Sequence, residues 1–81
     1  MKIIYSKQAI KTIQNMDAAT KQRMKVAIER LPDGDTKQIS GRNITTYRLR
    51  VGGWRVLYSI DNGDTISIEK IAPRGEVYRR V

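Results

Sequence analysis

Arginines dominate the second half of the chain and are the residues best suited to chemistry. Residues 42–81 carry 7 Arg and 1 Lys, whereas residues 1–41 carry 6 Lys and 2 Arg. The chain has no Cys and no His. A reaction would therefore have to use Arg, Lys, Tyr, Asp or Glu, and we expect neither a metal site nor a cofactor. Because a guanidinium group is a planar fork that matches phosphate geometry, the second half predicts a phosphate-binding site.

Three arginines fall on one face of a predicted hairpin. If Gly52-Gly53 is the whole loop, Arg50 lies directly across from Arg55, and Arg48 lies one pleat along. Like charges that face each other on a sheet destabilise it. The cluster is therefore typical of a face that binds a polyanion. The alternative is an exposed sheet face that charge keeps soluble, with arginines protecting its edge.

A second predicted hairpin adds a fourth cation to this face. If Asn62-Gly63 is its loop, Lys70 lies across from Arg55. In the same register Glu69 points to the other face and does not neutralise the cluster. After this strand, Pro73 and Gly75 predict a turn that carries Arg74 to the end of the sheet. Tyr78 follows, either as a core aromatic or as a phenol that acts as a base, an acid or a stacking platform for a nucleobase.

The first half of the chain predicts the helices that support this sheet. Residues 2–6 are typical of a short strand, and Ser6 can cap a helix. Asp17 or Thr20 can cap a second helix, which ends at residues 32–35. The expected apolar positions of the two helices are Ala9, Ile10, Ile13, Met16, Met24, Ala27, Ile28 and Leu31.

From residue 44 the apolar period changes from 3.6 to 2, which predicts a three-stranded antiparallel meander. One face of its first hairpin is apolar and should meet the helices, with Val51 facing Trp54, Leu49 facing Val56 and Tyr47 facing Tyr58. The fold class is therefore α+β, a two-layer sandwich in which an N-terminal strand and two amphipathic helices pack on one face of an antiparallel sheet.

Length and charge limit the possible functions. With 81 residues and no linker or repeat, we expect a single domain over residues 1–81. No apolar run approaches the roughly 20 residues of a membrane span, and residues 1–5 do not form a signal sequence, so we expect no membrane contact and a cytoplasmic protein. The net charge of +8 predicts an anionic partner.

Two sequence motifs resemble the RelE/ParE toxin superfamily, the small bacterial toxins of toxin–antitoxin pairs. The first is residues 47–58, Tyr-Arg-Leu-Arg-Val-Gly-Gly-Trp-Arg-Val-Leu-Tyr, a basic strand, a glycine turn and an aromatic-Arg strand. The second is the turn Ile-Ala-Pro-Arg at residues 71–74, followed by Glu-Val-Tyr-Arg at residues 76–79. Both motifs occur in the family's order and spacing, and the resemblance extends over essentially the whole chain, so it implies a RelE-like fold.

The resemblance implies a ribosome-dependent endonuclease that cuts mRNA codons in the A site without a metal. It implies an acidic antitoxin, the ribosome and mRNA as partners. By this resemblance, Arg48 and Arg55 would clamp the phosphate and stabilise its charge. Arg74 would protonate or stabilise the leaving 5′-oxygen, and Tyr78 or Arg50 would orient or deprotonate the 2′-OH. Further candidates for RNA binding are Lys70, Arg79 and Arg80.

Two departures from the family pattern affect proton transfer. Many relatives carry His immediately before the turn arginine, where this chain has Pro73, and some carry Lys at the positions of Arg48 and Arg50. An arginine hardly titrates, so it is a poor base. Two other functions stay open: a ParE-like toxin that inhibits DNA gyrase without nuclease activity, and a basic binding module without toxicity.

Overall fold

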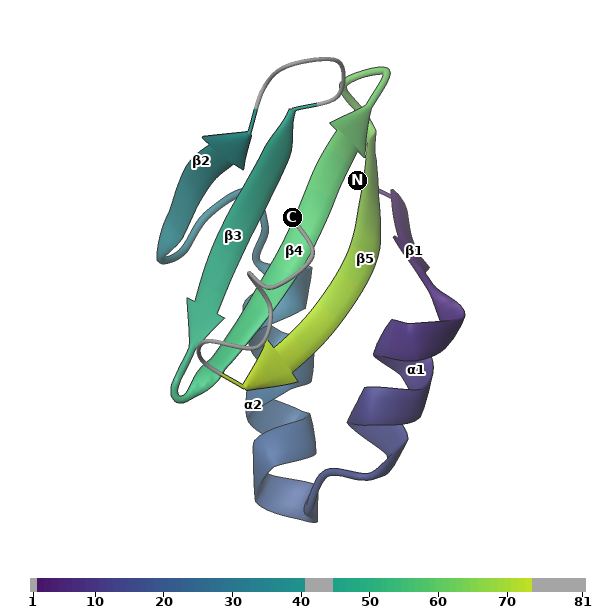
Figure 1. Cartoon of the computed structure of the whole chain (residues 1–81), viewed down its shortest axis with the longest axis vertical. Coiled ribbons are helices and arrows are strands. Elements are labelled where there is room, and N and C mark those ends of the chain that lie inside the picture. Colours follow the sequence, from purple (N-terminus) through teal and green to yellow (C-terminus); the bar gives the residue numbers. More distant parts are fainter. Residues whose placement is uncertain (1, 41–44, 74–81) are drawn as a thin grey trace.

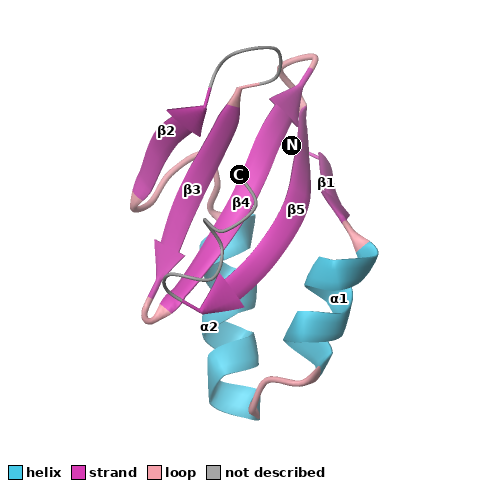
Figure 2. Cartoon of the chain, viewed as in Figure 1, coloured by secondary structure: helices cyan, strands magenta, loops and turns pink. Residues whose placement is uncertain are grey.

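The computed structural model describes residues 2–40 and 45–73 as a five-stranded sheet with two helices on one face (Figure 1). The strand order is β1-β5-β4-β3-β2. The elements are β1 (Lys2–Tyr5), α1 (Lys7–Gln14), α2 (Ala18–Glu29), β2 (Thr36–Ser40), β3 (Thr46–Val51), β4 (Trp54–Asp61) and β5 (Thr65–Pro73). Figure 2 shows the helices as one layer behind the strands; neither helix of the described residues lies on the other face of the sheet, which we call the open face.

The α+β two-layer arrangement confirms the fold class expected from the sequence. Two features go beyond that expectation. β1 joins the sheet as an edge strand parallel to β5, so the predicted antiparallel sheet with the N-terminal strand packed on its face is corrected to a mixed sheet that includes β1. β2 adds an edge strand beside β3, in antiparallel register.

Both helices begin at residues that the sequence marks as caps. Ser6 Oγ accepts a hydrogen bond of 3.0 Å from the backbone N–H of Ala9, and Asp17 Oδ1 accepts one of 2.7 Å from Thr20. The bond from Thr20 holds the pKa of the Asp17 carboxyl below its usual value. Asp17 is therefore the cap of α2, rather than Thr20.

The core lies between the helices and the sheet. Met24 and Ile28 of α2 are fully buried against Leu49 and Val56 of the first hairpin, as the apolar periods predict. The remaining predicted positions also pack there, with one exception. Ile10 is wrong as a core position, because its side chain on α1 is 44% exposed. Ala9, beside it, is the residue of α1 that is fully buried.

The hairpin of β3 and β4 has the predicted register. Val51 pairs with Trp54, Arg50 with Arg55 and Tyr47 with Tyr58. Gly52 takes the left-handed conformation, with φ +58°, that this tight turn requires. The side chains of β3 and β4 therefore alternate between the helix layer and the open face as the sequence indicates.

The register of β4 and β5 differs from the prediction for two reasons. The loop has three residues instead of the predicted Asn62-Gly63, because Asp61 pairs with Thr65, and β5 contains a bulge. Near the turn Tyr58 pairs with Ile68, but the next pair is Leu57 with Lys70. Glu69 is the extra residue, and it shifts the rest of β5 by one further position, so that the total shift from the predicted register is two. Arg55 consequently faces Ala72, so the predicted pairing of Arg55 with Lys70 is wrong.

Side chains of the α1 segment replace β1 along the outer edge of β5, where β1 ends. Ser6 Oγ donates to Glu69 O at 2.8 Å. Gln8 donates from Nε2 to Ile71 O and accepts at Oε1 from Ile71 N–H, both at 3.0 Å. Because these side chains satisfy backbone groups that a strand would otherwise pair, they fix α1 against the bulged half of β5.

Candidate nucleic-acid interface

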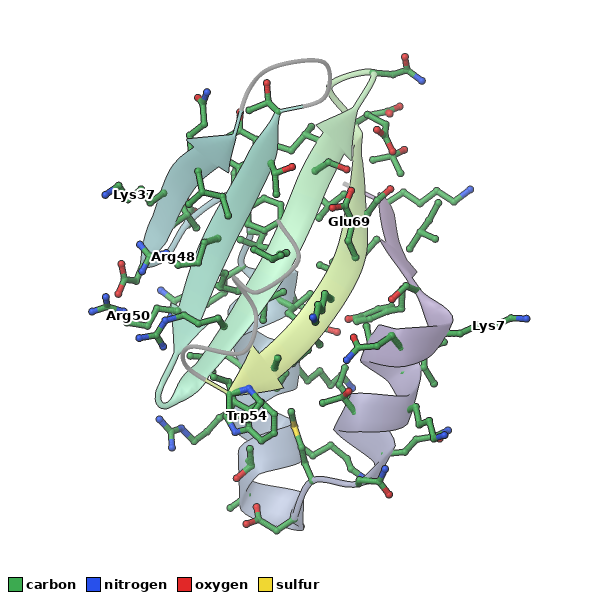
Figure 3. All side chains as sticks on the ribbon, viewed as in Figure 1. Lys7, Lys37, Arg48, Arg50, Trp54 and Glu69 are labelled. Carbon is green, nitrogen blue, oxygen red and sulfur yellow. The ribbon has the colours of Figure 1, made fainter. Side chains whose placement is uncertain are left out.

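Five cations lie in two neighbouring rows on the open face of the sheet. The first row runs across four strands, from Lys37 through Arg48 and Leu57 to Lys70, and the second pairs Arg50 with Arg55. Side chains at directly opposed positions are separated by roughly 5 Å. Figure 3 shows Lys37, Arg48 and Arg50 on the strands β2 and β3. We call this set the cationic face: Lys37, Arg48, Arg50, Arg55 and Lys70.

Arg48 is buried although it points away from the helices. It is 7% exposed, and its Nη2 lies 3.9 Å from Asp35 Oδ1. Its Nε is buried and has no hydrogen-bond partner among residues 2–40 and 45–73. A buried guanidinium donor without a partner is costly, so this nitrogen is a position where a ligand oxygen would be stabilising.

Arg50 shares the same carboxylate but lies at the surface. Its Nε is 3.6 Å from Asp35 Oδ2, and both side chains are more than half exposed. The backbone N–H of Arg50 also donates to Asp35 O at 2.9 Å, which extends the β2–β3 pairing by one residue. One carboxylate thus faces two guanidinium groups, both contacts are long and Asp35 itself is exposed, so Asp35 does not neutralise both arginines.

Backbone carbonyls hold Arg55 against the hairpin turn, and no acid among residues 2–40 and 45–73 forms an ion pair with it. Its Nη1 donates to Gly52 O at 3.2 Å and to Trp54 O at 2.9 Å. The residue is 5% exposed. These bonds fix the guanidinium beside Arg50 without removing its charge, which is the arrangement that preorganised anion binding requires.

The three-residue turn between β4 and β5 brings an unexpected acid onto this face. Glu69 accepts a hydrogen bond of 3.0 Å from Ser59 Oγ of β4. The prediction that Glu69 points to the helix side is therefore wrong, because Ser67 pairs with Ser59 and the alternation of β5 from Ser67 places Glu69 on the same face as Ser59. Figure 3 shows Glu69 on β5, whereas Arg50 lies on β3.

Four predicted site residues lie outside the described residues, namely Arg74, Tyr78, Arg79 and Arg80. Their roles remain predictions. Of the predicted residues that the structure describes, Arg48, Arg50 and Arg55 are brought together, and Lys70 lies two strands from Arg48 in the same row. Lys37 and Asp35 were not predicted as site residues, because the edge strand β2 was not predicted. Lys37 lies in β2, and Asp35 directly precedes it.

The described tyrosines belong to the other side of the sheet. Tyr47 and Tyr58 stack with ring centroids 5.3 Å apart in the core layer. Burial raises the pKa of Tyr58, an effect that a hydrogen bond with Thr36 partly offsets. Burial, together with the nearby charge of Glu29, raises the pKa of Tyr5. Neither phenol is placed to act as a base on the cationic face.

Two negative findings apply to the described part of the chain. Within residues 2–40 and 45–73, no three acidic, His or Cys side chains are grouped so that they could hold a metal ion. Within the same ranges, no helix has the length and apolar character needed to cross a membrane.

The fold and the arginine hairpin agree with a family of small toxins. A family model described as the ParE toxin of the type II toxin–antitoxin system parDE matches residues 3–78. The chain therefore belongs to the ParE toxin family, which confirms the resemblance seen in its motifs, and it is a toxin of a toxin–antitoxin system. No curated protein matches the chain.

Solved structures share the fold over nearly the whole chain. The archaeal RelE–RelB complex from Pyrococcus horikoshii OT3 is similar with a TM-score of 0.75 and 28% identity, over 93% of this chain and 96% of that one. A RelB–RelE antitoxin–toxin complex from Methanococcus jannaschii is similar with a TM-score of 0.72 and 26% identity, over 96% of this chain and 98% of that one. The YoeB dimer from Staphylococcus aureus has a TM-score of 0.67 and 20% identity, over 86% of this chain and 92% of that one. At this identity the likeness concerns the fold alone.

Proposed function

We propose that this toxin is a ribosome-dependent endoribonuclease that cuts mRNA in the A site without a metal. The observation that carries the proposal is the cationic face, where Arg48, Arg50 and Arg55 lie on adjacent strands with Asp35 as the shared carboxylate. A sheet whose side chains served stability alone would be more stable with positive and negative charges alternating at these positions. Facing arginines are instead suited to the phosphate groups of a ribose-phosphate chain.

The proposed reaction needs charge stabilisation more than covalent chemistry from the protein. The ribose 2′-oxygen forms a bond to the adjacent phosphorus, and the bond from phosphorus to the 5′-oxygen breaks. The proton of the 2′-OH leaves to a base, and a proton reaches the 5′-oxygen. The products are a 2′,3′-cyclic phosphate and a 5′-OH end. Negative charge accumulates on the phosphate oxygens in the transition state, where fixed guanidinium groups are most effective.

The described residues suit distinct parts of this reaction. Arg55, tied to Gly52 O and Trp54 O, is a rigid donor for a phosphate oxygen. Arg48 offers the Nε that has no partner among the described residues. Arg50 is exposed and can orient the 2′-OH or bind a neighbouring phosphate. We keep Arg74 for the leaving 5′-oxygen and Tyr78 for the 2′-OH as sequence-based parts of the proposal, and Lys70 as a contact for flanking RNA.

The partners follow from the same proposal. The solved relatives from Pyrococcus horikoshii and Methanococcus jannaschii are complexes of RelE with RelB, and the second is described as an antitoxin–toxin complex. We propose a cognate antitoxin for this chain, acidic because the chain carries +8. The ribosome and mRNA are the proposed targets, and the site of action is the cytoplasm.

A second candidate function is inhibition of DNA gyrase. The name of the matching family, ParE, favours it. Such a toxin would not need arginines arranged around one phosphate, which is why we rank it second.

A cell-free translation assay separates the two functions. Under the first proposal, primer extension on the translated message shows cuts in A-site codons, and the new 5′-OH ends accept phosphate from a polynucleotide kinase. Cutting should be lost in Arg50→Ala and retained in the control Lys7→Ala. The control also removes one charge, but from α1, where the side chain of Lys7 points away from the sheet in Figure 3. Intact message together with trapped gyrase–DNA breaks would overturn the nuclease proposal in favour of the second.

A further inference from the structure

A second arginine cluster lines a groove between α2 and the end of β3. The groove has a volume of about 430 Å³ and is lined by Arg23 of α2, by its C-cap residue Arg30, by Arg50 of β3 and by the turn residue Gly52. Arg23 and Arg30 are seven residues apart, which is two helical turns, so they share one side of α2 and lie about 10 Å apart along its axis. Three guanidinium groups from two distant segments thus meet in one groove.

No acid lines this groove among the described residues. Its lining holds no carboxylate, and the ion pairs found within residues 2–40 and 45–73 are those of Arg48 and Arg50 with Asp35. The neighbouring groove between α1 and α2 is different, because Lys21 and Lys25 share it with Glu29. The positive potential of the arginine groove is therefore available to an external anion.

The hairpin turn connects the groove to the cationic face. Arg23 Nη2 lies 3.1 Å from the point where a Cβ on Gly52 would stand, so the guanidinium of Arg23 rests directly over the turn. On the other side, Gly52 O accepts the hydrogen bond from Arg55 Nη1. Arg50 belongs to both sites, since it pairs with Arg55 and lines the groove. The two sites are consequently one continuous positive surface around the end of β3; in Figure 1, α2 lies behind the sheet and next to this end of the β3–β4 hairpin.

We infer that this groove binds phosphates of the RNA strand that flank the reacting phosphate on the cationic face. The inference rests on the proposed function, because it extends the same RNA path. Arg23 and Arg30 would hold the sugar–phosphate backbone without touching the bases, so the contact is independent of sequence. Arg50 would be the point at which the RNA passes from the sheet to α2.

The test is equilibrium binding of a fully 2′-O-methylated single-stranded RNA, which the toxin cannot cleave, measured by fluorescence anisotropy over a salt series. For single strands, each neutralised phosphate contributes about 0.7 to the slope of log K against log salt. Loss of two contacts in Arg23→Ala/Arg30→Ala should lower the slope by about 1.4 and weaken binding about 25-fold at 0.1 M salt. Arg23→Lys should bind within about threefold of the parent, since it keeps the charge.

The matched control is Lys21→Ala/Lys25→Ala, which removes the same charge from the same helix but from the groove that contains Glu29. This control should lose little affinity. Equal losses in the two double variants would overturn the inference, because they would reflect overall charge alone. Unchanged RNA binding by the arginine double variant, with weakened binding of an acidic antitoxin, would also overturn it and assign the groove to a protein partner.

The result is separable from the fate of the proposed function. If the arginine double variant loses RNA affinity while the parent fails to cut mRNA in translation, the groove stands as an RNA site and the nuclease proposal fails. Circular dichroism and thermal melting of each variant verify the fold, which we expect to be intact because Arg23 and Arg30 are exposed.

Discussion

Substitution of Arg55 should separate its structural contribution from its proposed catalytic one. Arg55→Ala removes the hydrogen bonds from Nη1 to Gly52 O and Trp54 O. Hydrogen bonds to a charged group contribute about 1.5–3 kcal/mol each. Water can replace the donor at a surface turn, and removal of Arg55 relieves its repulsion with Arg50, so we expect a net loss of about 2 kcal/mol in the free energy of unfolding.

That loss should leave the protein folded. An 81-residue domain has a stability of about 4–12 kcal/mol, and a loss of 2 kcal/mol lowers Tm by about 8–16 °C. The effect on cleavage should be larger, because one preorganised donor to a developing oxyanion contributes about 3–4 kcal/mol, a factor of about 10² to 10³ in rate. The variant should therefore be folded at 25 °C and nearly inactive.

The assay combines thermal melting by circular dichroism with the rate of mRNA cutting in cell-free translation. Lys7→Ala is the charge-matched control, and Arg55→Met retains most of the side-chain volume if the alanine variant is too unstable. A folded Arg55→Met protein that cuts within threefold of the parent rate would refute the proposed role. If both variants are unfolded at 25 °C, Arg55 is a structural residue of the hairpin.

Three further outcomes follow from the contacts. Asp35→Asn should strengthen binding of 2′-O-methyl RNA about fivefold at 0.1 M salt, with little change in stability. The reason is that the exposed carboxylate of Asp35 competes with RNA phosphates for Arg48 and Arg50. Weaker RNA binding by this variant would contradict the prediction. Ile28→Ala should cost about 2–5 kcal/mol in denaturant unfolding, because Ile28 is fully buried, and a cost below 1 kcal/mol would mean that the core is placed wrongly. Burial raises the pKa of Tyr58 above 10.0, so the unfolded chain loses that proton first. Stability should accordingly be retained below pH 10 and fall as the pH rises through the folded pKa, less steeply in Tyr58→Phe, and equal steepness in the two proteins would count against this.

The sequence predicts the β3–β4 hairpin well because its turn chemistry and its alternation agree. Gly52 permits the left-handed turn, and a one-residue shift would move Leu49 and Val56 out of the core. The pairing of Arg50 with Arg55, on which the site depends, follows from that constraint. The caps at Ser6 and Asp17 were predictable for the same local reason.

Other parts depend on contacts that local patterns do not contain. A three-residue turn and the bulge at Glu69 each shift β5 by one position and so move Lys70 away from Arg55, and nothing in the alternation of β5 indicates where an extra residue is tolerated. β2 is an edge strand with Lys37 and Gln38 exposed, so it lacks a clear apolar period. The burial of Arg48 and Arg55 likewise could not be predicted, because charged residues on an open sheet face are ordinarily exposed.

The most direct measurement of the central claim is an NMR titration of the arginine side chains. In toxin labelled with ¹⁵N, the Nε–Hε signals of Arg48, Arg50 and Arg55 report on the cationic face, and the amides of α1 report on the helix layer. Addition of 2′-O-methyl RNA should shift the three arginine signals, with the largest change at Arg48, whose Nε has no partner among the described residues. Shifts confined to α1 and the groove between the helices, with unchanged arginine signals, would contradict RNA binding on the open face of the sheet.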